Sequence, residues 1–211
     1  MVDIAIVDYG MGNLRSVYQA VHKVASAARV EITDNADVIA RAERVIFPGQ
    51  GAMPDCMREL HARGLREAVL DAARNKPFLG ICIGLQMLFE HSEEGDAPGL
   101  GVLAGNVVRF ATGLSDGEGH KLKVPHMGWN QVHHARHDLW AGIAQDERFY
   151  FVHSYFVQPV QSGLVQATSN YPQPFVCAVA QDNLFAVQFH PEKSAAAGLR
   201  LLQNFVNWKP A

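Results

Sequence analysis

The chain has few cysteines and no long hydrophobic run. Only Cys56, Cys82 and Cys177 occur among 211 residues, and this odd number at unpaired spacings fits a reducing compartment better than a disulfide framework. No apolar stretch approaches the length of a membrane span. The N-terminus passes directly into a strand-like segment, without the charged and apolar regions of a signal peptide. These absences predict a soluble, cytoplasmic protein.

Strong charge and compositional bias are also absent. The formal net charge is −3 and no run of Lys or Arg occurs, so neither nucleic acid nor a membrane surface is indicated as a partner. Repeats, low-complexity segments and linkers are not visible. The length suits one domain, and a domain of this size buries roughly 70% of its unfolded surface. We therefore predict a single domain over residues 1–211.

Short apolar strands alternate with helical patterns in the first part of the chain, which is typical of a parallel sheet covered on both faces. The expected strands and helices are 4–7, 13–27, 30–33, 36–40, 45–47, 53–75 (broken near Gly64) and 78–80. After about Gly95, glycine-rich turns separate β-rich runs, which predict antiparallel strands added at the sheet edge. These runs, followed by a closing helix, are 105–110, 121–124, 129–133, 148–152, 164–169, 175–180, 184–189 and 194–206.

The most informative segment joins a strand pattern to a helix pattern through a cysteine. A buried-strand run at 77–79 meets Gly80-x-Cys82-x-Gly84 and passes into helical spacing at 85–89. This is the layout of a nucleophile elbow, with sulfur in place of a serine hydroxyl. The glycines would permit the sharp turn, and a cysteine at a helix N-terminus would favour the thiolate. On this segment alone, a buried structural cysteine beside a tight turn stays open.

A nucleophilic cysteine needs a base, and one of the ten histidines is well placed for this role. A β-rich run ends at His190-Pro191-Glu192. Residues two apart in an extended segment point the same way, so Glu192 could orient the imidazole of His190. Alone, this segment would be interpreted more simply as a surface turn. Together with the elbow, it predicts a Cys82–His190–Glu192 triad.

These paired motifs resemble the class I, triad-type glutamine amidotransferase domain over essentially the whole chain. They are Gly80-x-Cys82-x-Gly84 with Gln86, and Phe189-His190-Pro191-Glu192. Three further blocks resemble the glutaminase subunits of imidazole glycerol phosphate synthase: IVDYGMGNLRSV at 6–17, PHMGWN at 125–130 and FYFVHSY at 149–155. The resemblance implies a flavodoxin-like α/β fold, an open mostly parallel sheet flanked by helices with antiparallel edge strands. It also implies glutamine hydrolysis without a metal or organic cofactor.

The same resemblance implies how glutamine and the developing oxyanion are bound. The residues implied are Gly49, Gln50, Gly51, Ile83, Gln86, His153, Ser154 and Tyr155. The glycine-rich stretch ends a strand, where the loops of an open α/β sheet surround the ligand crevice. Its backbone N–H groups could face an oxyanion beside the amide of Ile83. Gln50 departs from the small apolar residue expected there. From the residues alone, a connecting turn and a sheet-core role for Tyr155 both stay open.

The resemblance further implies a partner, a (β/α)₈-barrel cyclase subunit that uses the ammonia. The products would be imidazole glycerol phosphate, on the path to histidine, and aminoimidazole carboxamide ribotide. The expected interface residues are Tyr9, Asn13, Arg15, Trp129, Asn130 and Lys193. Two alternatives remain: a paralogous glutaminase that supplies another sugar or nucleotide pathway, and a catalytically silent scaffold. The intact triad argues against the scaffold, and the identity of the partner would separate the other two.

Two further patterns carry less weight. Gly10-x-Gly12 is not a dinucleotide fingerprint, because Arg15 occupies the third glycine position and no acidic residue follows a second strand at the right distance. The histidines at 133, 134 and 137 lack a cysteine or carboxylate at zinc-site spacing, so a surface loop is the better interpretation. His137-Asp138 is equally suited to begin a helix. No metal site is therefore predicted.

Overall fold

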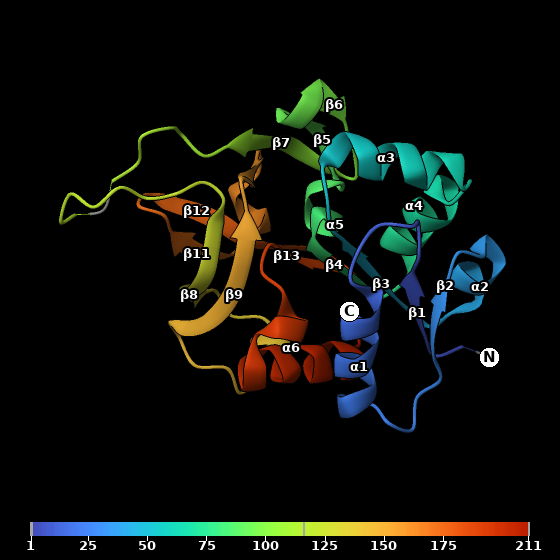
Figure 1. Cartoon of the computed structure of the whole chain (residues 1–211). Helices are drawn as coiled ribbons and strands as arrows, with labels where there is room; N and C mark the ends of the chain where they lie inside the picture. The colour runs from blue at the N-terminus through green and yellow to red at the C-terminus, as the bar shows by residue number, and fades with distance from the viewer. Residues whose placement is uncertain (1, 116, 211) are drawn as a thin grey trace.

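The computed structural model, which describes residues 2–115 and 117–210, is built around one twisted sheet with helices on both faces (Figure 1). Five neighbouring strands run parallel in the order β2-β1-β3-β4-β13, which is the flavodoxin-like order. Their bounds are β1 Ile4–Val7, β2 Val30–Thr33, β3 Arg44–Gly49, β4 Phe78–Cys82 and β13 Leu184–Val187. All except the edge strand β2 are largely or wholly buried, which explains the continuous apolar runs of the sequence. The predicted fold class is confirmed.

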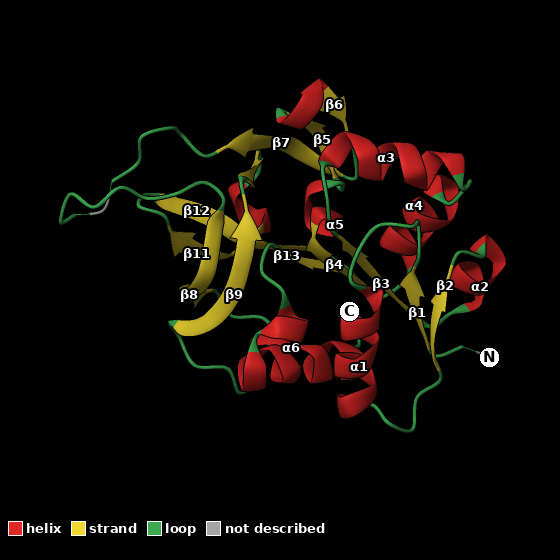
Figure 2. Ribbon diagram, in the orientation of Figure 1, coloured by secondary structure: helices red, strands yellow, loops and turns green. Residues whose placement is uncertain are grey.

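Helices cover the two faces of this parallel region (Figure 2). On one face, α1 packs against α6, and on the other α2 packs against α4 beside α3. The bounds are α1 Leu14–Val24, α2 Ala36–Arg41, α3 Met53–Ala62, α4 Arg66–Asn75 and α6 Ala195–Asn207. In α1 the buried side chains Val17, Ala20 and Val21 recur at helical spacing, and the Asn13 side chain caps the N-terminus. The predicted break near Gly64 is present, with that residue at φ +67°.

The second half of the chain extends the sheet with mainly antiparallel strands. From β13 the order continues β12-β10-β7-β5-β6, and β11 joins β12 to the pair β8 and β9. The bounds are β5 Phe89–Ser92, β6 Ala97–Pro98, β7 Leu103–Arg109, β8 His126–His134, β9 Glu147–His153, β10 Tyr155–Pro159, β11 Val165–Asn170 and β12 Pro174–Gln181. Short 3₁₀ helices lie between some of these strands: η1 Glu94–Asp96, η2 Asp138–Trp140 and η3 Ser162–Leu164. Another, η4 Pro191–Lys193, lies between β13 and α6.

Two local expectations are wrong. The run at 121–124 is not a strand: it lies in the long β7–β8 connection, where the only pairing described is an isolated bridge between Ser115 and Lys121. The helix expected to continue through 85–89 is one turn, α5 (Ile83–Gln86), and the chain then enters β5. Met87, Leu88 and Phe89 are all fully buried, so their run carries no period that separates helix from strand. The strand β10 at 155–159 was not expected.

This topology gathers several loops at one sheet edge. The carboxyl ends of the parallel strands β1, β3, β4 and β13 lead into residues 8–13, 50–52, 83–86 and 188–194. These ends lie side by side because Gly49 of β3 stands opposite Cys82 of β4, and β13 pairs with the other edge of β4. In an open α/β sheet such an edge holds the ligand crevice. No helix in the described part of the chain combines the length and apolarity needed to cross a membrane.

Candidate active site

Cys82 is the last residue of β4 and has an unusual backbone conformation, φ 56° and ψ −111°. Such strain at a strand-to-helix turn is typical of a nucleophile elbow. The flanking glycines have a different role from the expected one, since neither has a positive φ. A Cβ on Gly84 would overlap the carbonyl oxygen of Phe47, and a Cβ on Gly80 would lie 3.0 Å from that of Ala186. They allow the turn to pack tightly, while the cysteine itself carries the strain.

His190 follows β13 and contacts Glu192 across one intervening residue. The distance from His190 Nδ1 to Glu192 Oε1 is 2.8 Å, and the two side chains are only 7% and 2% exposed. The predicted proximity is present, but the reasoning from an extended strand is wrong, because Glu192 lies in the 3₁₀ turn η4. The turn is anchored to β9: His190 N donates to Tyr150 O at 2.9 Å. Ser194 Oγ donates to His190 O at 2.6 Å and accepts from Tyr150 N at 3.0 Å.

The electrostatic environment of His190 favours its protonated form. Burial acts against the charge, but a thiolate at Cys82 and the carboxylate of Glu192 together outweigh it and raise the pKa of His190 to about 10. The second ring nitrogen, Nε2, has no partner at hydrogen-bonding geometry. Long contacts between catalytic groups are common before substrate binds. The site therefore places an imidazolium beside the Cys82 sulfur.

A cavity of about 230 Å³ opens beside these residues. Its walls bring together the loop after β3, the end of β4 with α5, the end of β9 with the start of β10, and η4. The predicted residues that line it are Gln50, Gly51, Cys82, Ile83, Gln86, His153, Ser154, Tyr155, His190 and Lys193. Glu94, Pro125 and Val152 also line it and were not predicted. Gly49 lies directly behind, pressed between Tyr9 and Ile83: a Cβ there would overlap the Tyr9 hydroxyl.

The predicted oxyanion loop, residues 49–51, lies between α3 and the loop that joins β1 to α1, residues 8–13. Gly51 has a φ of +114°, and a Cβ there would lie 2.7 Å from the end of the Met11 side chain. The buried Cys56 thiol lies 3.7 Å from the carbonyl oxygen of Gln50, to which it donates. Burial raises the pKa of Cys56 to about 11, so this group stays a thiol and keeps its hydrogen. The Gln50–Gly51 peptide is thus held by a contact with α3.

Two glutamines lie behind the nucleophile. Gln86 Nε2 donates to Tyr155 O at 3.1 Å and to Gln188 Oε1 at 3.0 Å, while Gln86 Oε1 is buried without a partner. Gln188 Nε2 in turn lies 3.8 Å from Cys82 Sγ. Sequence reasoning missed Gln188, although a glutamine inside the apolar run before His190 is a usable signal. A buried amide needs hydrogen-bond partners, and those of Gln188 are Gln86 and the Cys82 sulfur.

Glu94 supplies a carboxylate to the cavity wall. Its Oε2 accepts a hydrogen bond from Met53 N at 2.8 Å and so satisfies a free N–H at the start of α3. No local signal indicates this role, because Glu94 lies in the acidic stretch EEGD, which is typical of an exposed turn. Glu94 is therefore one of the charged residues that line the cavity.

The predicted interface residues do not all lie on one surface. Trp129 on β8 is 48% exposed, and Lys193 Nζ lies 5.9 Å from the ring centroid of Tyr150, which pairs with Trp129. Tyr9 is fully buried against Phe47, so its prediction as a contact residue is wrong. Asn13 and Arg15 are exposed and line a groove between α1 and η4, and Asn130 is engaged in internal hydrogen bonds.

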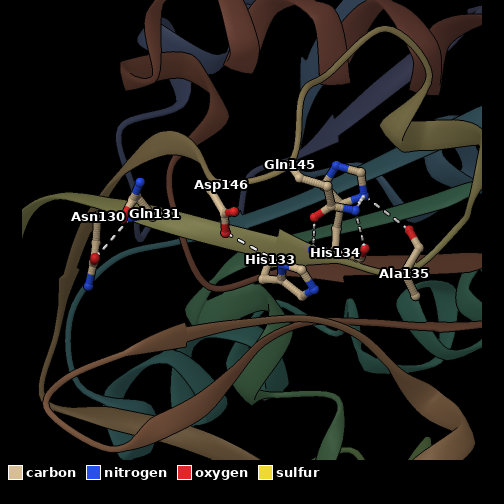
Figure 3. Close-up of polar contacts among 7 residues, drawn as sticks. All are labelled: Asn130, Gln131, His133, His134, Ala135, Gln145 and Asp146. Atoms are coloured by element: carbon tan, nitrogen blue, oxygen red, sulfur yellow. Dashed lines mark hydrogen bonds and ion pairs between the residues drawn. The ribbon is translucent and has the colours of Figure 1, made fainter.

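The three clustered histidines have separate partners, and those of His133 and His134 are drawn in Figure 3. His133 forms an ion pair with Asp146 at 3.4 Å, whereas His134 contacts Ala135 O at 3.1 Å. His137 accepts from Leu139 N at 3.1 Å and so begins η2, the alternative that its sequence allowed. Among residues 2–115 and 117–210, no group of three or more His, Cys, Asp or Glu side chains is arranged to hold a metal ion.

Comparisons with known proteins show which family the chain belongs to. The family model described as glutamine amidotransferase class-I matches residues 5–208. The chain is 66% identical to imidazole glycerol phosphate synthase subunit HisH of Thiobacillus denitrificans, over 99% of this chain and 92% of that protein. It is 65% identical to the subunit of the same name in Nitrosospira multiformis, over 100% of both.

Solved structures share the fold at much lower identity. A crystal structure of a glutamine amidotransferase superposes with a TM-score of 0.72 at 17% identity, over 97% of this chain and 99% of that one. A glutamine amidotransferase from Thermotoga maritima superposes with a TM-score of 0.60 at 16% identity, over 90% of this chain and 76% of that one. At such identity these similarities concern the fold alone.

Proposed function

Because the chain belongs to the class-I glutamine amidotransferases and, within them, to the family of imidazole glycerol phosphate synthase HisH subunits, we propose that it hydrolyses glutamine with a Cys82–His190–Glu192 triad. The ammonia passes to a cyclase subunit in histidine biosynthesis. One observation carries the proposal. A buried His190–Glu192 pair, 2.8 Å between Nδ1 and Oε1, faces a strained cysteine at a strand-to-helix turn. A scaffold would have no need to maintain this arrangement.

The proposed reaction has two stages. The Cys82 thiolate attacks the side-chain carboxamide carbon of glutamine, and the oxyanion is met by the N–H of Ile83 and by an N–H of the Gly49–Gly51 loop. His190 donates its proton to the departing nitrogen, which leaves as ammonia, and a γ-glutamyl thioester remains. Water, deprotonated by His190, then attacks the thioester carbon. Glutamate leaves and the Cys82 thiol is restored.

The polar groups of the cavity set the orientation of glutamine. Gln86 lines the cavity, both hydrogens of its Nε2 are used, and its buried Oε1 is the group of this amide left for a substrate N–H. Glu94 supplies the carboxylate for the α-ammonium group. The backbone and hydroxyl groups of the His153–Tyr155 segment, which also lines the cavity, suit the α-carboxylate. These contacts select an amino acid with a free amine and a side-chain amide.

The surface near the cavity supports a protein partner. Met127 and Trp129 are 61% and 48% exposed on β8, large apolar side chains of the kind that anchor interfaces. Lys193 lines the cavity and lies within cation–π range of Tyr150. The proposed partner is the cyclase subunit, which adds the nitrogen to form imidazole glycerol phosphate and aminoimidazole carboxamide ribotide. Ammonia would pass directly between the two active sites.

The test uses two nitrogen sources and the complex with the cyclase subunit. With glutamine, we expect glutamate and imidazole glycerol phosphate in equal amounts, and with excess ammonium salt the cyclase should form product without glutamine. A complex that uses only ammonium would identify this chain as a silent scaffold. Glutaminase activity that appears only with a different synthase would identify it as a paralogue for another pathway.

A further inference from the structure

Two buried histidines form a pair beneath the cavity wall. His126 of β8 and His153 of β9 stand opposite each other in the strand register, and His126 Nδ1 lies 2.9 Å from His153 Nε2. Both are almost wholly buried. Burial lowers the pKa of His126 to about 4 and that of His153 to about 3, so both rings are neutral. A neutral imidazole has one donor and one acceptor, so each ring has a definite tautomer.

The tautomers follow from the end of the chain of hydrogen bonds. His153 Nδ1 lies 2.8 Å from Tyr155 O, which can only accept, so His153 carries its hydrogen on Nδ1. Its Nε2 is then an acceptor, and His126 must donate from Nδ1. His126 Nε2 is therefore an acceptor in turn. Every link in this chain donates in the same direction, toward Tyr155.

The first donor is the side chain of Asn130, whose orientation is fixed independently. Asn130 Nδ2 lies 3.2 Å from His126 Nε2 and donates to Asn170 O at 2.8 Å, while Asn130 Oδ1 accepts from Gln131 N at 2.8 Å. The amide thus presents its nitrogen to the ring, as the tautomer of His126 requires. Asn130 is adjacent to the exposed Trp129, so the chain starts at the surface proposed for the partner.

The last acceptor also holds a substrate-binding side chain. Tyr155 O accepts from His153 and from Gln86 Nε2, and the other hydrogen of Gln86 Nε2 goes to Gln188. Both amide hydrogens are thus used, and Gln86 Oε1 is a buried acceptor without a partner. The orientation of this amide, and with it the polarity of the cavity wall, depends on the position of the Tyr155 carbonyl.

We propose that His126 is a positioning residue for glutamine, acting through His153 and the Tyr155 carbonyl on the Gln86 amide. The proposal rests on the glutaminase function proposed above. Aromatic packing helps to hold the His126 ring in place, since it stacks on Tyr171 at 4.1 Å between centroids. Without the His126 donor, His153 Nε2 is a buried acceptor with no partner, and only the hydrogen bond to Tyr155 O is left to hold the ring. Glutamine binding suffers, whereas the chemistry at Cys82 does not.

The experiment compares three variants in the complex with the cyclase subunit. His126→Phe keeps the aromatic volume but removes both ring nitrogens, and His126→Asn keeps an N–H donor near the position of Nδ1. Phe175→Leu is the matched control, because Phe175 packs edge-on against His126 at 5.7 Å but has no place in the hydrogen-bond chain. We measure kcat and KM for glutamine, ammonia-dependent turnover and the midpoint of thermal unfolding.

We expect His126→Phe to raise KM for glutamine roughly three- to tenfold, the range of a single hydrogen bond, with a smaller change in kcat. His126→Asn should recover most of this loss. Phe175→Leu should lower the unfolding midpoint and leave KM unchanged. Ammonia-dependent turnover should be the same in all variants.

The proposal is overturned if His126→Phe leaves KM unchanged, if His126→Asn is equally impaired, or if Phe175→Leu raises KM as much. Should His126→Phe not fold, Asn130→Ala tests the chain from its half-buried end, and an unchanged KM there also overturns it. A wild-type complex that consumes no glutamine would instead refute the glutaminase function, independently of every variant.

Discussion

His190 and Glu192 are held together by a turn of the backbone, not by an extended strand. Their side chains meet at 2.8 Å within η4, and Ser194 fixes the turn by bonding both His190 O and Tyr150 N. The carboxylate is therefore placed by backbone contacts that do not involve its own charge. A substitution that keeps its shape should change the electrostatics of His190 without moving the ring.

Glu192→Gln should shift the alkaline limb of the glutaminase pH profile to lower pH. Glu192 is among the groups that raise the pKa of His190 to about 10, and burial acts in the opposite direction. Without the carboxylate the pKa of His190 falls, so the proton needed for ammonia release is lost at lower pH. The measurement is kcat against pH in the complex, with the exposed Glu147→Gln as control. An unmoved limb would assign it to another group.

Cys82→Ala should abolish glutamine-dependent synthesis and leave ammonia-dependent synthesis intact. The sulfur is the only nucleophile proposed to contact the carboxamide, and triads on other folds lose nearly all turnover without it. Cys177→Ala is the matched control, since Cys177 is buried in β12. Cys56 is a poorer control because its thiol holds the Gln50 carbonyl. Equal loss of both activities in Cys82→Ala would point to a role in folding or assembly.

The fold was predictable where local pattern and environment agree. The central parallel strands are buried on both faces, and their apolar runs between helical segments are visible without any tertiary information. Phe89 is different. Its side chain is fully buried, so hydrophobicity alone does not show whether the residue continues α5 or begins β5. Its pairing with β7 decides that it begins the strand.

The site was predictable to a similar limit. Cys82 and His190 were found from the short motifs around them, although the sequence did not indicate the turn after His190. Gln188 contacts the Cys82 sulfur across 106 residues of chain, and nothing near Gln188 indicates that contact. Glu94 also depends on a distant partner, the free N–H of Met53. Such residues are placed by the packing of the whole domain.

Glu94→Gln should raise KM for glutamine about tenfold or more, with little change in stability. The substitution removes the charge proposed to bind the α-ammonium group, and hydrogen bonds to charged groups contribute more than neutral ones. The new side-chain oxygen can still accept from Met53 N and cap α3. Kinetics of the complex with unchanged thermal unfolding would support the assignment. An unchanged KM would show that the ammonium group binds elsewhere.

Gly84→Ala should destabilise the fold as well as the site. A Cβ there would overlap Phe47 O, which belongs to a central strand and cannot move aside cheaply. Overpacking of this kind costs typically about 1–3 kcal/mol and more where backbone is involved. Gly163→Ala is the control, because a Cβ at that position meets nothing within 4 Å. Urea unfolding of the two variants should differ clearly. Equal midpoints would mean that the elbow is loosely packed.

The isolated chain should be nearly inactive and should be activated by its partner with nucleotide bound. A glutaminase that ran without its partner would waste glutamine, and supplying a missing oxyanion donor is worth about 10²–10³-fold in turnover. A rotation of the Gly49–Gln50 peptide would turn the Gln50 N–H toward the cavity, and a ligand or partner need only bind that state more tightly. Glutaminase rates are measured for the isolated chain, with partner, and with partner plus nucleotide.

The control for this activation must avoid Gly49, where any side chain would overlap the Tyr9 hydroxyl and disturb packing. Trp129→Ala is better suited, since the side chain is half exposed on the proposed partner surface. We expect the isolated variant to be as slow and as stable as the wild type, and its activation by the partner to be reduced. Full activity of the isolated wild-type chain would contradict the prediction, because the oxyanion donors would then already be in place.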